Sequence, residues 1–149
     1  MKIAKLALKA VLLLGLLTGF GAAELYPKMG TITVKLNGVE SNKGTLLLYL
    51  YDKKDRWMKP ERAAVVEKVQ PKAGEMVIQL SAPLGRRYAL SVIHDENDNG
   101  KVDTGFPIPK PVEPVGASYF TGNSIPRFYN CSFRFNQEPL ELEVQMRRP

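Results

Sequence analysis

The hydrophobic pattern alternates with a period of two in several stretches of the chain, which is typical of half-buried β-strands. In the final stretch, for example, Leu140, Leu142 and Val144 alternate with Glu141 and Glu143. One other run is apolar or aromatic at every position, which predicts a strand covered on both faces. We expect seven strands, at residues 31–36, 45–51 (the continuous run), 63–69, 75–80, 88–94, 131–135 and 140–147.

Turn residues separate these stretches and indicate how the strands connect. Asn37-Gly38 and Asn42-Lys43-Gly44 lie between the first two strands, so we predict that these two form a β-hairpin. Residues 52–61 are polar and predict a loop or a single helical turn, with Trp57 packed on the sheet. No stretch has the period of an amphipathic helix. The pattern therefore predicts an all-β fold, a single antiparallel β-sandwich of about seven strands, immunoglobulin-like or transthyretin-like.

The N-terminal residues do not fit this domain. Residues 1–9 carry three lysines and no acid, residues 10–17 are apolar, and Gly21, Ala22 and Ala23 suit a cleavage site. The apolar run is much shorter than the roughly 20 residues that a membrane-spanning helix needs. We therefore predict a signal peptide at 1–23 and a mature domain at 24–149. The domain is expected to be periplasmic or secreted, with no membrane span once the leader is removed.

Charge and cysteine content narrow the expectations for the mature domain. The whole chain has a net charge of +6, but three of its lysines belong to the leader, which leaves about +3. This modest charge and the exported location argue against a nucleic-acid partner. Arg147-Arg148 is expected to be a solvated end. Cys131 is the only cysteine, so we expect it to be buried and the domain to be held together by its core.

Residues 95–118 lack periodicity and carry four prolines, which predicts a long irregular loop. Loops of this length inside a small domain are usually functional or mobile. Oxygen-bearing side chains stand at alternate positions in its first part, followed by Gly100, where the backbone must turn sharply. This order resembles the oxygen ligands of a calcium loop. The expected ligands are Asp95, Asn97, Asn99, the carbonyl of Lys101, Asp103 and, from farther along, Glu113.

The loop also departs from that calcium pattern. Its twelfth position, where a bidentate glutamate is usual, is Phe106, and a strand precedes it instead of a helix. A calcium site with so few charged ligands is expected to bind calcium weakly, as extracellular modules do, with Kd on the order of 10⁻⁴–10⁻³ M. The alternative is a metal-free turn, stabilised around Gly100 by hydrogen bonds from Asx side chains.

Three hypotheses about function follow. The first is a non-enzymatic exported module, in which the 95–118 loop binds a protein or envelope partner. The second is a metal-assisted hydrolase that uses His94, the only histidine, with Asp95, Glu96 or Asp103. Neighbouring strand residues point to opposite faces, so Asp95 is poorly placed to orient His94, and the first hypothesis is preferred. The third is a structural envelope component whose interface aromatics would be Trp57, Tyr119, Phe120, Phe128 and Tyr129. The sequence does not specify an oligomeric state.

The loop and several flanking segments together resemble a bacterial exported family, domain of unknown function 2141. The resemblance spans residues 30–146 and implies a leader peptide and a sandwich-like domain, but no activity. Pro111 and Val112 look inserted, and Val115 stands where the family has an aromatic residue. The segments that carry the resemblance are residues 37–52, Arg87–Leu90, His94–Asn97, Asn99–Thr104, Phe106, Ile108–Lys110, Glu113–Ser118 and Phe128–Phe133, with Cys131 in place of an alanine.

Overall fold

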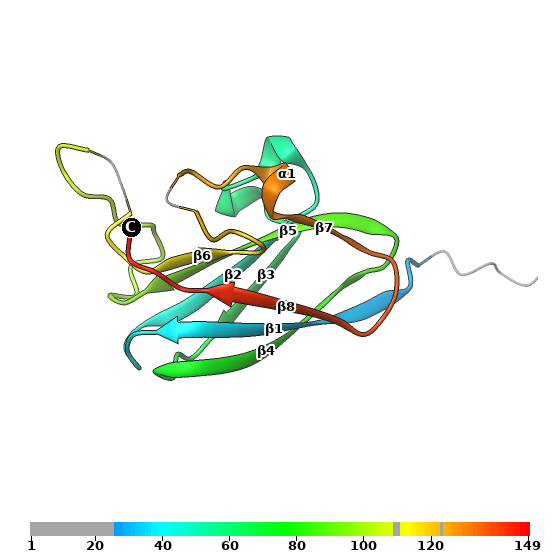
Figure 1. Ribbon diagram of the computed structural model, residues 1–149, viewed down its shortest axis with the longest axis horizontal. Helices are drawn as coiled ribbons and strands as arrows, with labels where there is room; N and C mark the ends of the chain where they lie inside the picture. The colour runs from blue at the N-terminus through cyan, green and yellow to red at the C-terminus, as the bar shows by residue number, and fades with distance from the viewer. Residues whose placement is uncertain (1–25, 109–110, 123) are drawn as a thin grey trace, which may run out of the picture.

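The computed structural model describes residues 26–108, 111–122 and 124–149. The predicted signal peptide, residues 1–23, lies outside the described residues. Strands in the described part form two sheets (Figure 1). The first contains, in spatial order, β4 (Gly74–Pro83), β1 (Met29–Val39) and β8 (Leu140–Gln145). The second contains β3 (Val65–Val69), β2 (Thr45–Tyr51) and β5 (Arg86–Asp95), with β6 (Val115–Ala117) and β7 (Ser132–Phe135) both pairing with β5.

The main hydrophobic core joins the inner faces of these two sheets. Every second residue of β1 contributes to it, because side chains alternate between the two faces of a strand. Burial of one such aliphatic side chain stabilises the fold by roughly 1.5–3 kcal/mol. The prediction of a mostly-β protein is confirmed. The core residues of the four longest contributors are Ile32, Val34, Leu36 and Val39 of β1, Leu46, Leu48 and Leu50 of β2, Ile78, Leu80 and Ala82 of β4, and Tyr88, Leu90 and Val92 of β5.

A second apolar cluster covers the opposite, outer face of the five-stranded sheet. It includes Leu47, Tyr49 and Tyr51, which alternate with the core residues of β2, so this strand is buried on both faces as predicted. Short helical turns lie over this face: η1 (Lys54–Arg56), η2 (Pro60–Arg62) and α1 (Phe128–Cys131) (Figure 1). Trp57 anchors the first two, since its ring packs edge-on against Tyr51 at 5.3 Å between centroids.

The predicted hairpin between the first two strands is wrong. β1 pairs with β4 and β8, whereas β2 pairs with β3 and β5 in the other sheet. Both strands carry an apolar face, and these faces are buried against each other across the sandwich, so their connection crosses between sheets. The expected turn at Asn37-Gly38 lies inside β1. There Gly38 has a positive φ of 78°, and the register with β4 shifts, which makes it a β-bulge.

The arrangement is also not entirely antiparallel. β1 and β8 run parallel, with Ile32 opposite Leu140 and Leu36 opposite Val144. Two strands joined by a tight turn must be antiparallel. β8 is not joined to β1 by a turn, because it follows β7 of the other sheet, so the two can run parallel.

The predicted strand at 131–135 begins one residue later than expected. Cys131 is the last residue of α1, and β7 begins at Ser132. No helix in the described ranges is long and apolar enough to cross a membrane.

Candidate functional site

The predicted calcium loop begins where β5 ends. Asp95, the last residue of β5, is paired with Thr45 at the start of β2, so this end of the loop is fixed by the sheet. Asp95 is buried, and both of its carboxylate oxygens accept backbone N–H groups of the turn that follows. Oδ1 takes the N–H of Asn99 at 3.1 Å and Oδ2 that of Gly100 at 2.8 Å. Gly100 has a φ of 72°, the positive value expected of a glycine in a sharp turn.

Three further predicted ligands meet on the other side of the same turn. Asn97 and Asn99 donate from their side-chain amides to the two carboxylate oxygens of Asp103, at 2.6 and 2.9 Å. Asn99 thus connects the two carboxylates, because its backbone N–H bonds to Asp95 and its side chain to Asp103. The structure brings these four side chains into one hydrogen-bonded group. Lys101 joins the group through its backbone, whose N–H donates to Oδ1 of Asn99 at 2.8 Å.

Glu113 reaches the loop as predicted but contacts different atoms. Its side chain is buried and accepts the backbone N–H of Glu96 at 3.1 Å and that of Asp103 at 3.3 Å. The carboxylate therefore links the two ends of the 95–103 turn. In the structure it bonds to the backbone of the turn, while the Asn97–Asn99–Asp103 group is held by its own side-chain bonds.

Comparison with protein-family models gives one match, to a family described as an uncharacterised protein conserved in bacteria, DUF2141, over residues 34–143. This covers well over half of the chain. The chain belongs to the DUF2141 family. Neither the curated proteins nor the solved structures include a match to this chain.

The donor set of the DUF2141 loop fits a hard cation such as calcium, because every candidate ligand is an oxygen. Asn97 and Asn99 present their amide nitrogens to Asp103, and their amide oxygens accept the backbone N–H groups of Asn99 and Lys101. Among the described residues, no three His, Cys, Asp or Glu side chains gather into a group that could hold a metal. A calcium ion would therefore depend on amide and carbonyl oxygens as well as on Asp95 and Asp103.

Contacts that the sequence did not predict hold this loop against the sandwich. Arg148, expected to be solvated, donates to carboxylates of both Glu40 and Glu96 at 2.6 and 2.9 Å. The hydrogen bond from Arg148 is the main reason that the pKa of Glu96 is lower than usual. On the other side, Thr45 donates to Asp98 at 2.7 Å. The partners in these three contacts lie 53, 108 and 52 residues apart in the sequence, so no local sequence signal indicates them.

His94 is fully buried on the inner side of the sheet, opposite Leu46. Its Nε2 lies 2.8 Å from the carbonyl oxygen of Lys43, and because a carbonyl can only accept, this nitrogen carries the proton. The other ring nitrogen, Nδ1, is buried without a hydrogen-bond partner among the described residues. His94 thus fastens the β1–β2 connection to β5.

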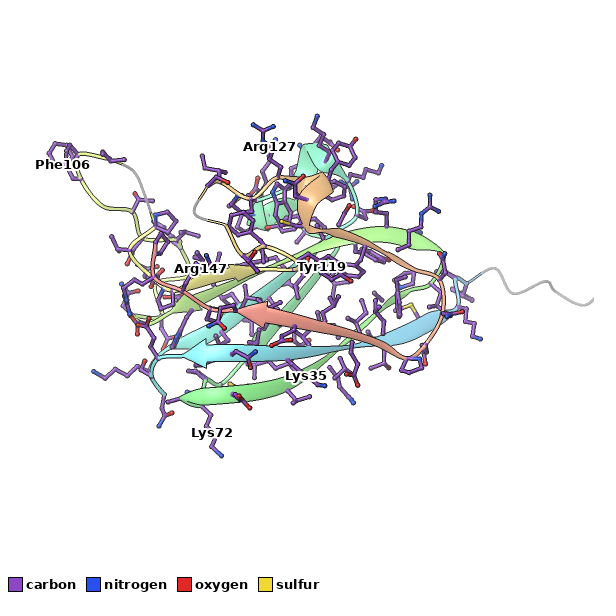
Figure 2. The ribbon with its side chains drawn as sticks, viewed as in Figure 1. Lys35, Lys72, Phe106, Tyr119, Arg127 and Arg147 are labelled. Carbon is purple, nitrogen blue, oxygen red and sulfur yellow. The ribbon has the colours of Figure 1, made fainter. Side chains whose placement is uncertain are left out.

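The far end of the DUF2141 loop is exposed and apolar. Its two arms are held together by the N–H of Val112, which donates to the carbonyl of Asp103 at 2.9 Å. Beyond this bond Phe106 is 98% exposed and Ile108 63% exposed. Figure 2 shows Phe106 at the tip, well away from both sheets.

Of the five predicted interface aromatics, Tyr119 and Tyr129 are exposed, whereas Trp57, Phe120 and Phe128 pack into the outer cluster.

Proposed function

We propose that the protein is an exported, non-enzymatic binding or structural module, in which weakly bound calcium organises the 95–118 loop for contact with a protein or envelope partner. One observation carries this proposal: Asp95, Asn97, Asn99 and Asp103 are joined by hydrogen bonds within a single turn, in which Asn99 bonds to both carboxylates.

Calcium would supply positive charge between Asp95 and Asp103, which now depend on N–H donors alone. Asp95 and Glu113 have distinct roles in ordering the turn. Asp95 orders the turn through the N–H groups of Asn99 and Gly100. Glu113 fixes the distance between the two ends of the turn by accepting from Glu96 and Asp103. Ordering the base of the loop would in turn restrict its tip.

The tip provides the surface for the partner. Phe106 and Ile108 are large, exposed apolar side chains that gain from being removed from water. Phe106 projects from the body of the domain (Figure 2). An apolar tip supported by a rigid base is suited to insertion into a complementary apolar site on a protein or envelope component. The leader-like residues 1–23 support the location outside the cytoplasm.

Calcium titration of the metal-free protein tests the proposal. Stabilisation follows RT ln(1 + [L]/Kd), so the free energy of unfolding should rise by about 1.4 kcal/mol when calcium is at roughly ten times Kd. Asp95→Asn and Asp103→Asn should each abolish this rise. Asp98→Asn is the matched control, because it removes the same charge from the same turn at a position outside the predicted ligand set. No calcium-dependent rise in the wild type, or an equal loss in all three variants, would remove calcium from the proposal.

Partner binding has its own test. Phe106→Ser should leave the thermal unfolding temperature unchanged, because the side chain is exposed. The same variant should weaken recovery of envelope proteins by chemical cross-linking in cells, whereas Val66→Ser, an exposed apolar site on β3, should not. Equal recovery with Phe106→Ser and wild type would contradict a role for the tip.

N-terminal sequencing of the same cellular material tests the leader, and the sequence should begin at Glu24 if the leader is cleaved.

The hydrolase hypothesis has less support from the geometry. A general base must reach the proton that it removes, but His94 is fully buried and its Nε2 is engaged by Lys43. His94 also faces the inter-sheet core, away from the group formed by Asn97, Asn99 and Asp103. The binding-module proposal needs no movement of His94, and we therefore prefer it.

A further inference from the structure

A cavity of about 510 Å³ lies beside β6, on the outer side of the five-stranded sheet. Its volume is within the range of small-molecule sites, roughly 300–1,000 Å³. Its walls come from segments that are distant in sequence: Ile93 of β5, Ala117 of β6, Phe120 and Ile125 of the following segment, and Arg147 after β8. The cavity adjoins the 95–103 turn through Val102, but none of the predicted calcium ligands lines it.

The walls of the cavity are mostly apolar, and the apolar character continues to its rim. Ile93 and Ala117 are buried in the outer cluster, whereas Ile125 is 79% exposed. Tyr51 also contributes, and it stays a neutral phenol because burial raises its pKa to about 12. An apolar ligand body would thus find apolar contacts, with no anionic phenolate among them.

The charged side chains that line the cavity are all positive, and Pro149, whose C-terminal carboxylate is negative, also lines it. Among the described residues that line it there are two arginines, Arg147 and Arg148, and no aspartate or glutamate. Arg148 is already paired with Glu40 and Glu96. Arg147 forms no ion pair with a carboxylate in the described part of the chain, so its charge is uncompensated there.

Arg147 is held in place without being neutralised. Its Nη1 donates to the carbonyl oxygens of Thr121 and Gly122 at 3.0 and 2.9 Å. Its guanidinium carbon lies 6.0 Å from the centre of the Phe120 ring, within the range of a cation–π contact. The remaining N–H groups, on Nε and Nη2, have no partner among the hydrogen bonds of the described residues. Figure 2 places Arg147 beside β6.

We propose that this cavity binds a small amphipathic carboxylic acid, with its apolar part between the sheet and Phe120 and its carboxylate on the guanidinium of Arg147. Charge complementarity supports this occupant, because a fixed guanidinium with unused donors favours a carboxylate, and hydrogen bonds to charged groups are the stronger ones. The proposal goes beyond the calcium-organised loop and rests on different residues, so either can fail alone.

The protein carries its own reporter of binding. Trp57 is the only tryptophan in the chain. Its Nε1–H donates to the carbonyl of Pro126 at 2.9 Å, and its ring contacts Tyr51, and both of these residues line the cavity. A ligand that enters the cavity should therefore change the fluorescence of Trp57.

The test compares three probes of equal chain length below their micelle-forming concentrations: decanoate, decan-1-ol and decylammonium. Titration of the wild-type protein should show saturable fluorescence changes, with decanoate bound at least about tenfold more tightly than the alcohol and decylammonium bound most weakly. Equal affinity for all three probes, or no saturable binding of decanoate, overturns the proposal. This arm needs no variant and is independent of any effect on folding.

Variants then assign the carboxylate. Arg147→Gln should weaken decanoate binding about tenfold and leave decan-1-ol binding within about twofold, since the substitution removes the charge but none of the apolar side chains of the walls. Arg134→Gln, an exposed arginine of β7 outside the cavity, removes the same charge and should leave both affinities as in the wild type. An equal loss of decanoate affinity in the two variants would mean that net charge alone attracts the ligand, and would overturn the role of Arg147.

Discussion

Arg148 donates from Nη2 to Oε2 of Glu96 at 2.9 Å, and this bond joins the end of the sheet to the first turn of the 95–118 loop. The same guanidinium donates from Nη2 and Nε to Oε2 of Glu40 at 2.6 and 3.1 Å, and from Nη1 to the carbonyl of Val112 at 2.8 Å. One side chain therefore connects the β1–β2 connection with both arms of the loop.

Arg148→Gln should destabilise the protein modestly. The carboxylates of Glu40 and Glu96 are partly exposed, and exposed ion pairs contribute at most about 1 kcal/mol each. We expect the free energy of unfolding, measured by urea denaturation at pH 7, to fall by about 1–2 kcal/mol. Arg134→Gln should change it by less than about 0.5 kcal/mol. A loss no larger than that of this control would contradict a connecting role for Arg148.

Lowering the pH should remove part of the contribution that Arg148 makes to the free energy of unfolding. Arg148 lowers the pKa of Glu96 below its ordinary value of 4.5 in the folded protein. The unfolded state therefore binds a proton first as the pH falls, so the stabilisation is present above 4.5 and is lost as the pH falls through the lowered pKa. Urea denaturation between pH 6 and pH 3 should show a steeper decline for wild type than for Arg148→Gln. Parallel declines would contradict this coupling.

Two glycines with similar backbone angles should respond differently to alanine. Gly44 and Gly85 both have positive φ, 71° and 79°, which costs an alanine roughly 1–2 kcal/mol. At Gly85 a Cβ would meet nothing within 4 Å, whereas at Gly44 it would overlap the carbonyl of Asp95. Gly85→Ala should therefore lose about 1–2 kcal/mol of unfolding free energy, and Gly44→Ala clearly more, with the calcium response lost as well. Equal losses would mean that the β1–β2 connection tolerates displacement from Asp95.

The local alternation of apolar and polar residues was sufficient to predict most strands, because a strand that is buried on one face has an apolar residue at every second position. The outer cover of the five-stranded sheet could be anticipated too, since residues 45–51 are apolar on both faces. Strand partners could not be predicted. Asn37-Gly38 has the composition of a turn, but whether it becomes a turn or a β-bulge depends on β4 and β8, which are far along the chain.

The shared turn of residues 95–103 could be predicted for a similar reason, but its contacts with the rest of the domain could not. Asp95, Asn97 and Asn99 are close in sequence, so the spacing of their oxygens indicates a shared turn. Glu113 was expected as a ligand, and only the fold shows that it accepts backbone N–H groups. The cavity beside β6 left no sequence signal, because its walls are assembled from residues far apart in the chain, from Tyr51 to Pro149.

Adding charge to the loop should strengthen calcium binding. Asn97→Asp would place a second carboxylate beside Asp103, replacing an amide that donates to it at 2.6 Å. Without metal the two like charges repel, so the metal-free variant should be less stable than wild type. With calcium the added charge should lower Kd by up to about an order of magnitude, because ligand charge tunes sites of this kind. Calorimetric titration measures this directly. Unchanged calcium affinity together with lower stability would favour a metal-free turn.

The thiol of Cys131 should be protected from reagents and should make stability sensitive to alkali. The residue is fully buried in the outer cluster, and burial raises the pKa of its thiol from 9.0 to about 11. Reaction with a thiol-specific disulfide reagent at pH 8 should be slow in the native protein and fast in urea, since the thiolate is the reacting form.

The effect of alkali follows from the direction of that shift. The unfolded state loses the thiol proton first as the pH rises, so the stabilisation is present below pH 9.0 and is lost as the pH rises toward the folded value of about 11. Wild-type stability should therefore decline more steeply over this interval than that of Cys131→Ala. Tyr51 in the same cluster also has a raised pKa, but it is present in both proteins, and its effect cancels in the comparison. Identical declines, or rapid modification of the native protein at pH 8, would show that α1 opens readily and that the outer cluster does not bury this thiol in solution.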